Sequence, residues 1–222
     1  MIVKQVTYPQ TDRWSYLWLL IGIVLSALSF TAYGRWVIPL AAWFAIIFIL
    51  RFVRTQRRIW LAYLILVIAN ALYMWFVLPE FLGLLLPSIV IGSSLAGSLI
   101  PTLDRLLVAR LRGFTATLVY PLIATAFEFA LATTNPLGSA GMTAYSQYDN
   151  LPLLQLVSVT GMLGITFLIA WFGSVVNWAW EQEREWTAIR RGAAIYAGIL
   201  LLVLAYGEAR LWLAPIAENT VR

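Results

Sequence analysis

The stretch IWLAYLILVIANALYMWFVL, from Ile59 to Leu78, decides the fold of this chain. It carries no charged residue, and Asn70 is its one amide side chain. A helix needs about 20 mostly apolar residues to cross the roughly 30 Å hydrocarbon core of a bilayer. Because lipid offers no hydrogen bonds to the backbone, an uninterrupted apolar run of this length predicts a membrane-spanning helix.

Further apolar runs of similar character lie on both sides of this stretch. They are Trp14 to Tyr33, Trp36 to Leu50, Phe81 to Ile100, Phe114 to Leu131, Pro152 to Trp178 and Ala193 to Tyr206. The runs beginning at Trp36 and Ala193 are the shortest. Together the sequence predicts an all-α, polytopic membrane bundle of seven transmembrane helices.

The composition of the 222 residues agrees with a membrane protein. It is 62% hydrophobic and 11% charged, whereas a soluble domain is about 45–50% apolar and about 25% charged. The net charge of +5 could suggest nucleic acid as a partner. The basic residues lie between the apolar runs, however, which indicates membrane topology and not nucleic-acid binding.

The positions of the basic residues also predict an orientation. Cytoplasmic loops of membrane proteins carry an excess of Lys and Arg. With the N-terminus inside, only Arg35, Arg210 and Arg222 of the 15 basic residues fall in outer segments. The inner segments hold Lys4, Arg13, Arg51, Arg54, Arg57, Arg58, Arg105, Arg110, Arg112, Arg184, Arg190 and Arg191. We therefore expect an N-in, C-out arrangement.

Cysteine and histidine are both absent from the chain. Their absence excludes thiol nucleophiles, disulfides and imidazole-based catalysis, and leaves Ser146 and Ser158 without a histidine to activate them. We expect no metal site and no cofactor. No catalytic constellation is recognisable in the sequence.

The longest predicted outer loop, Ala132 to Leu151, contains no Lys or Arg. Loops beyond about 12–15 residues are usually functional or disordered. The aromatic residues Tyr145 and Tyr148 favour a position against the membrane interface. Glu128 precedes this loop among apolar residues, so it either serves a function within the membrane or simply reaches the interface.

Other polar and small residues each allow two interpretations. Asn70 predicts a hydrogen bond between helices, or the lining of a polar path. Small residues four apart at Gly92 to Ser98 predict packing within the bundle, or dimerisation. The segment Leu103 to Arg112 predicts a basic amphipathic turn on the inner leaflet. Outer polar residues form a rim that could receive a lipid headgroup: Glu80, Asp149, Glu208 and Arg210.

The middle of the chain resembles the membrane domain of apolipoprotein N-acyltransferases, most strongly over residues 120–180. The matching segments are AFEFAL at 126–131, NPLGS at 135–139, AYSQ at 144–147, PLLQL at 152–156 and TGMLGITFLIAW at 160–171. Further on, GEARL at 207–211 and TVR at 220–222 resemble the exit of that family's seventh span toward an outer nitrilase-like domain. The family often has an aromatic run before its Tyr-Ser-Gln element, which is replaced here by NPLGS.

The resemblance implies a division into a transmembrane domain, 1–211, and an outer linker, 212–222, toward a nitrilase-like domain that we expect to be absent from this chain. In the family that domain uses Glu, Lys and Cys to pass an acyl chain from a phospholipid to the N-terminal amine of a lipoprotein. This chain has no Cys, and its one lysine, Lys4, is on the inner tail, so we expect it to be inactive alone.

What the resemblance does imply for this chain is a supporting role in a bacterial inner membrane. Its partners would be membrane phospholipids, a nitrilase-like domain or subunit, and lipoprotein substrate. A lipid-facing mouth would be shaped by Glu128, Tyr145, Ser146, Gln147 and Tyr148. Two other hypotheses stay open: a small lipid or solute transporter with Asn70 and Glu128 along its path, and a non-catalytic membrane scaffold.

Overall fold

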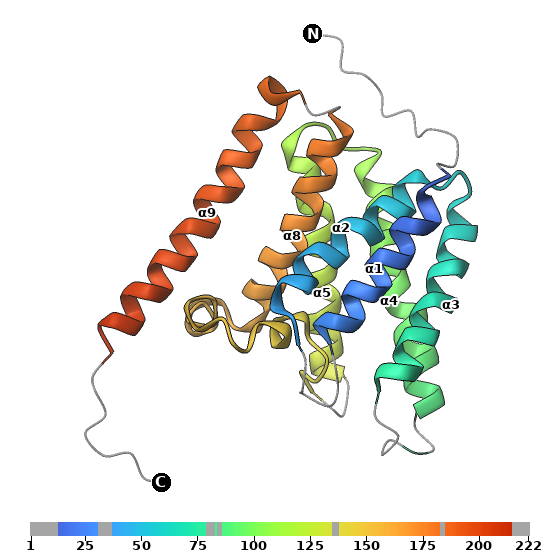
Figure 1. Cartoon of the computed structure of the whole chain (residues 1–222), viewed down its shortest axis with the longest axis horizontal. Coiled ribbons are helices and arrows are strands. Elements are labelled where there is room, and N and C mark those ends of the chain that lie inside the picture. Colours follow the sequence, from blue (N-terminus) through green and yellow to red (C-terminus); the bar gives the residue numbers. More distant parts are fainter. Residues whose placement is uncertain are drawn as a thin grey trace.

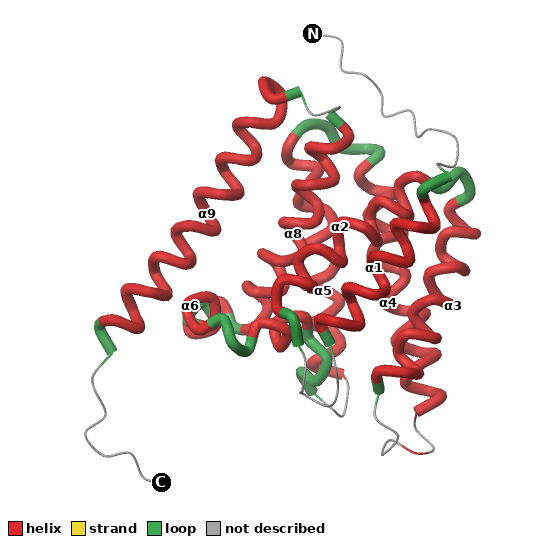
Figure 2. Tube along the Cα trace, in the orientation of Figure 1, coloured by secondary structure: helices red, strands yellow, loops and turns green. Residues whose placement is uncertain are grey.

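The computed structural model describes residues 13–30, 37–78, 83, 86–134, 138–182 and 185–214. Within these ranges the regular structure is entirely helical, and no strand occurs (Figure 2). The α-helices are α1 (Ser15–Ser29), α2 (Pro39–Thr55), α3 (Ile59–Val77), α4 (Leu86–Val108), α5 (Val119–Thr134), α6 (Leu151–Leu154), α7 (Val157–Thr160), α8 (Met162–Glu181) and α9 (Trp186–Trp212). Two 3-10 helices, η2 (Phe114–Leu118) and η3 (Thr143–Gln147), precede α5 and α6.

The long helices run up and down beside one another, and each is antiparallel to the one before it (Figure 1). Helices α1 to α5 and α8 form a bundle in which α1 packs on α2, α3 on α4, and α8 on both α2 and α5. Helix α9 leans away from this bundle and touches it mainly through α6 and α8. The short helices α6 and α7 lie between α8 and α9, and we call these two helices the foot.

Five helical segments are long and apolar enough to cross a membrane, by length and composition. They are Ile59–Val77, Leu86–Val108, Phe114–Thr134, Met162–Glu181 and Trp186–Trp212. Helices α1 and α2 are shorter, with 15 and 17 residues. The prediction of an all-helical membrane protein is confirmed, whereas seven spans in an N-in, C-out orientation stay a prediction.

Three helix boundaries differ from the predicted runs. Helix α8 begins at Met162 and not near Pro152, because Gly161 takes a positive φ of 65° and ends α7, a conformation that glycine adopts without steric penalty. Helix α4 continues to Val108. Helix α9 extends on both sides of the predicted Ala193 to Tyr206 run, so that Arg190 and Arg191 belong to the helix and not to a loop.

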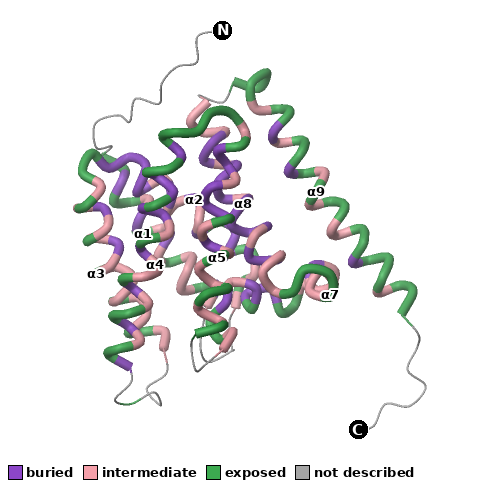
Figure 3. Tube along the Cα trace, turned by 180° about the vertical axis from the view of Figure 1, so that it is seen from behind, coloured by how far each residue is buried: buried purple, intermediate pink, exposed green. Residues whose placement is uncertain are grey.

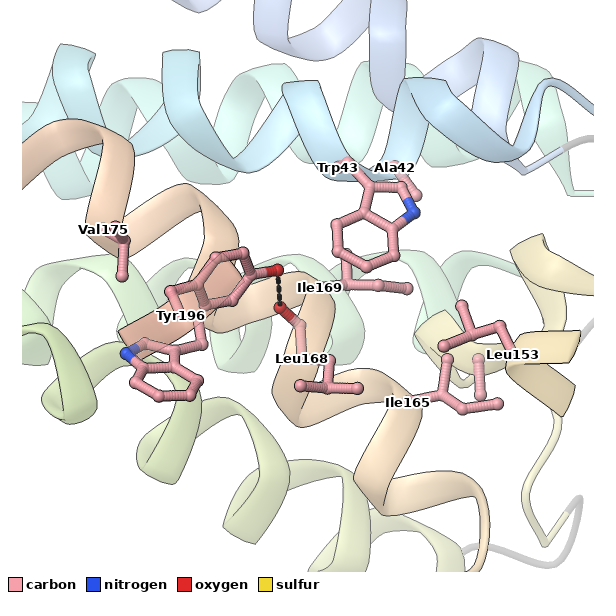
Figure 4. Close-up of a cluster of buried hydrophobic side chains, with 10 residues drawn as sticks. Ala42, Trp43, Leu153, Ile165, Leu168, Ile169, Val175 and Tyr196 are labelled. Atoms are coloured by element: carbon pink, nitrogen blue, oxygen red, sulfur yellow. Dashed lines mark hydrogen bonds between the residues drawn. The ribbon is translucent and has the colours of Figure 1, made fainter. Parts of the chain in front are cut away.

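The largest hydrophobic core lies where α8 packs against α2 and the foot. Its fully buried members include Leu153, Ile165 and Ile169, with Trp43 from α2 beside them (Figure 4). The Tyr196 hydroxyl of α9 donates to the Leu168 carbonyl at 3.1 Å. Burial concentrates on α8, while most of α9 is exposed or half-buried (Figure 3). Helices α3 and α9 thus have the fewest buried residues for their length among the long helices.

An amide and a hydroxyl join α3 and α4, as one of the two interpretations of Asn70 predicted. The Asn70 amide donates to the Ser98 hydroxyl at 3.0 Å, which is a hydrogen bond between these helices. In α4, Ser94 and Ser98 are fully buried against the bundle. Gly92 and Gly97 face open space, however, so close helix packing uses the serines and not the glycines.

Charged side chains close one end of the bundle. Arg54 of α2 donates to Asp104 of α4 at 2.8 and 3.1 Å, and to Glu181 of α8 at 3.2 Å. Arg105 donates to the carbonyl of Val53 at 2.7 Å. The predicted surface turn at Leu103 to Arg112 is therefore wrong in its first part, because α4 continues through it and Asp104 and Arg105 are buried. Arg54 and Arg105 thus join helices and are not loop charges.

Candidate functional site

The loop between α5 and α6 folds back onto the end of the bundle opposite Arg54 (Figure 1). Within its described part, residues 138–150, Gly138 and Gly141 take positive φ values of 58° and 86°. Such values allow the sharp turns that lead into η3. Asn150 then caps α6, its side chain accepting from the Leu153 amide at 3.3 Å. The loop is ordered by turn formers at both of its ends.

Glu128, near the end of α5, ties the loop to two helices. Its Oε1 accepts from the amide and the hydroxyl of Thr143 at 2.9 and 2.6 Å. Its Oε2 accepts from the hydroxyl of Thr166 in α8 at 2.6 Å. A half-buried carboxylate with three short hydrogen bonds holds its neighbours firmly, because bonds to a charged acceptor are the stronger kind. Glu128 therefore holds η3 in place, and both of its carboxylate oxygens accept hydrogen bonds from protein groups.

Gln147 makes a second tie, at the end of η3. Its side chain is fully buried, and its amide donates to the carbonyl of Pro39 at 2.8 Å and to Ser146 Oγ at 2.9 Å. Its Oε1 accepts from the indole N–H of Trp43 at 3.1 Å. Buried amides are tolerated when their donors and acceptors are paired. Gln147 thereby joins the loop to the first turns of α2.

The remaining predicted site residues differ in exposure. Ser146 is buried, and its hydroxyl donates to the Thr143 carbonyl at 2.7 Å. Tyr145 and Tyr148 are 44% and 46% exposed on the outside of the loop. The Asp149 carboxylate, on the neighbouring residue, raises the pKa of the Tyr148 phenol above its ordinary value. Three of the five residues, Glu128, Ser146 and Gln147, are therefore buried or half-buried, and the other two carry exposed aromatic rings.

This arrangement offers a shaped surface and no reacting group. The hydroxyls of Thr143, Ser146 and Thr166 already have carboxylate or carbonyl partners. Among the residues that the structure describes, no group of three or more acidic side chains could hold a metal ion. The site presents exposed aromatic rings next to polar groups.

Sequence reasoning missed the partners of the predicted residues. Thr143, Thr166 and Trp43 complete the two ties, and Trp43 is distant from the loop in sequence. From the sequence alone, a threonine or a tryptophan in an apolar helix does not reveal that its side chain forms a hydrogen bond with a distant residue. Of the predicted polar rim, Asp149, Glu208 and Arg210 are exposed. Glu80 lies outside the described residues, as does the NPL part of the NPLGS segment.

Comparisons with known proteins agree on one family. Residues 21–175 match the family model of the apolipoprotein N-acyltransferase N-terminal domain. The apolipoprotein N-acyltransferase of Geobacter metallireducens is 31% identical over 108 residues, which is 45% of this chain and 20% of that relative. The matched part thus spans about a fifth of the relative's length. No solved structure matches the chain.

Proposed function

The chain belongs to the apolipoprotein N-acyltransferase family through its N-terminal membrane domain, and we propose that it anchors an outer catalytic domain and presents lipid substrates to it. The catalytic partner would be a nitrilase-like domain or subunit, reached through residues 212–222. The membrane would be the bacterial inner membrane. In this proposal residues 1–211 do not transfer the acyl chain themselves, since they contain no cysteine to carry it.

The observation that supports this role best is the ordered loop at one end of the bundle. It lies inside the segment that matches the family model. Glu128 and Gln147 hold it in place, and it leaves Tyr145 and Tyr148 exposed. Tyrosine is favoured at the boundary between lipid and water. A fixed loop with exposed tyrosines is suited to guiding a lipid from the membrane to a domain above it.

Exposed tryptophans support the proposal that α3 and α9 span the membrane. Trp60 and Trp75 lie near the two ends of α3, and Trp186 and Trp212 at the two ends of α9, all more than half exposed. Tryptophan is enriched at both interfaces of a membrane. Helix α9 has 27 residues and is about 40 Å long, which matches the roughly 40–45 Å of a bilayer with its headgroups.

The function is tested by reconstitution. The chain is placed in phospholipid vesicles with a nitrilase-like catalytic domain, supplied separately or fused after Arg222. Transfer of a labelled acyl chain to a peptide with a lipidated N-terminal cysteine is then measured. We expect transfer to depend on the membrane chain and to fall in the double variant Tyr145→Ala/Tyr148→Ala. No transfer with the unaltered chain would overturn the proposal, and full transfer by the variant would reduce the chain to a scaffold.

The orientation is tested separately, and the absence of cysteine makes the test simple. Single cysteines at Tyr148 and at Arg57 are labelled in intact cells with a reagent that does not cross the membrane. We expect Tyr148→Cys to be labelled from outside and Arg57→Cys only after lysis. The reverse pattern would show that the bundle is inverted.

No observation among the described residues favours the transporter hypothesis. Asn70 is used in a hydrogen bond to Ser98, and Glu128 in bonds to Thr143 and Thr166. A flux assay in the same vesicles would test it, because solute movement through the chain alone is not expected from an anchoring domain. Transport at a rate above that of empty vesicles would favour it.

A further inference from the structure

A second polar group lies at the same end of the bundle, between the foot and α9. The Arg210 guanidinium of α9 donates through Nη1 to the hydroxyl of Ser158 in α7 and, at 3.3 Å, to the hydroxyl of Tyr206. The two hydroxyls are themselves 3.3 Å apart. Within the described ranges no carboxylate pairs with Arg210. This is a cation whose partners are all neutral hydroxyls.

The position of Arg210 is fixed by a close contact of backbones. Gly207 is buried against α6, where a Cβ would collide with the backbone of Pro152. Residues three and four apart lie on one face of a helix, so Tyr206, Gly207 and Arg210 face the foot together. The contact between α6 and α9 thereby sets Arg210 beside Ser158. The cluster is a consequence of how the two helices pack.

The donors of this cluster suit an anionic, tetrahedral oxygen group. Only Nη1 of Arg210 is engaged in the described part of the chain, which leaves Nη2 and Nε free to donate. A guanidinium presents its donors in a fork that matches phosphate oxygens, and such charged bonds are strong. Ser158, Tyr206 and Arg210 are all exposed, so a ligand can reach them.

The exposed apolar part of α9 indicates which class of phosphate compound would bind beside Arg210. Leu202 lies one turn before Tyr206 on the same face, and it is 71% exposed. The exposed stripe therefore changes from apolar at Leu202 to polar at Tyr206 and Arg210 toward the end of the helix. A soluble phosphate has no apolar surface that could pack against Leu202. An amphiphile with a phosphate head and hydrocarbon chains matches the whole stripe.

We propose that Arg210, Ser158 and Tyr206 bind the phosphate diester of a glycerophospholipid in the outer leaflet, with an acyl chain lying against Leu202. The inference rests on the proposed function for the side of the membrane. It goes further by assigning the headgroup to α9 and the foot, apart from the loop that carries Tyr145 and Tyr148. Arg210 then selects a phospholipid over lipids that lack a phosphate.

The test measures lipid binding by the full chain in mixed micelles. Two fluorescent lipids are compared, a phosphatidylethanolamine and a diacylglycerol with the same acyl chains. We expect Arg210→Gln to weaken phosphatidylethanolamine binding about tenfold, the effect of losing one charged hydrogen-bonded contact. Diacylglycerol binding is expected to stay unchanged, and Ser158→Ala and Tyr206→Phe to weaken phosphatidylethanolamine less than Arg210→Gln does.

The matched control is Arg191→Gln, which removes the same charge from the other end of α9, where Arg191 is also exposed. It is expected to bind both lipids like the unaltered chain. Equal weakening by Arg191→Gln would show a general charge effect and overturn the site. Displacement of the labelled phosphatidylethanolamine by millimolar inorganic phosphate would show an anion site without lipid selectivity, which also contradicts the proposal.

The two proposals fail in different ways. If the unaltered chain binds phosphatidylethanolamine no better than diacylglycerol, presentation of phospholipid by this domain fails, and the site fails with it. If the unaltered chain prefers phosphatidylethanolamine but Arg210→Gln keeps that preference, the Arg210 site alone is wrong. Melting temperatures of all variants are measured beside the binding curves, and Arg210→Lys is expected to restore part of the preference by returning the charge.

Discussion

The two ends of the bundle are closed by different chemistry. At one end the helices join directly, through the buried charges of Arg54 and Asp104 and the half-buried Glu181. At the other end a folded loop joins them, and the donors to Glu128 and Gln147 are neutral threonine, tryptophan and backbone groups, with Ser146 and Pro39 as acceptors. At the first end the charged side chains are mostly buried. At the second end the loop exposes Tyr145 and Tyr148.

This difference separates an end closed by buried ion pairs from an end closed by a hydrogen-bonded loop. A buried charge that loses its partner is strongly unfavourable, so the Arg54 end allows one arrangement. At the other end the bonds to Glu128 are also made to a carboxylate, but this side chain is only half-buried, and Tyr145 and Tyr148 beside it are exposed. Four substitutions test this difference.

The largest effect is expected at the charged end. Asp104→Ala leaves the Arg54 guanidinium buried without its closest carboxylate, and we expect a loss of about 3–5 kcal/mol of unfolding free energy. Thermal unfolding in detergent, followed by near-ultraviolet circular dichroism, measures it. Asp149→Ala removes an exposed carboxylate and serves as the control. Equal melting of the two variants would show that the charged network does not hold this end.

Removal of the second tie is expected to have a smaller effect. Gln147→Ala leaves the Trp43 indole N–H and the Pro39 carbonyl without their partner and opens a small cavity, for a loss of about 2–3 kcal/mol. Gln155→Ala, whose amide makes one long bond near the surface, is the matched control. The same melting experiment compares them. A Gln155 variant as unstable as the Gln147 variant would contradict the assignment of Gln147 as the tie.

A substitution at Glu128 is expected to loosen the loop more than the bundle. Glu128→Gln keeps the shape but removes the charge and one acceptor, for a loss of about 1–2 kcal/mol. Hydrogen exchange should then rise at the Thr143 amide and across residues 138–150. Exchange near Arg54 should not change. The exposed Glu208→Gln is the control, and uniform loosening of both ends would refute the separation between them.

The smallest effect on stability is expected at the exposed rings. Tyr148→Ala removes contacts with solvent or lipid and should change the unfolding free energy by less than about 0.5 kcal/mol. The acyl-transfer assay should nevertheless show a lower rate, because the ring is lost where lipid is expected to pass. Phe129→Ala, an exposed apolar residue on α5, is a control for general lipid contact. A large fall in melting temperature would mean that Tyr148 is structural.

The sequence predicted the helical membrane fold because the signal for it is local. Continuous apolar runs such as Ile59 to Leu78 need no knowledge of the rest of the chain, and α3 begins and ends within one residue of that run. The predicted helix boundaries were wrong where one backbone angle, or a contact with a residue distant in sequence, determines where a helix begins or ends. Gly161 breaks the sixth run, and the ion pair with Arg54 makes Asp104 part of a longer α4.

The candidate site was only partly accessible to sequence reasoning. Glu128 was recognised as unusual, because a carboxylate between apolar residues stands out. Its partners Thr143 and Thr166 could not be recognised, since their pairing depends on how α5, η3 and α8 meet in space. The link between Ser158 and Arg210 has the same origin, because the residues are brought together by the packing of Gly207 on Pro152.

The lean of α9 makes this helix responsive to the thickness of the bilayer. Its 27 residues are about 40 Å long, more than the roughly 30 Å hydrocarbon core, and a helix accommodates such an excess by tilting. Because Gly207 attaches the end of α9 near Arg210 to α6, thinner membranes would swing the rest of the helix further from α8, and thicker ones would bring it closer. Lipid chain length would then set the angle between α9 and α8.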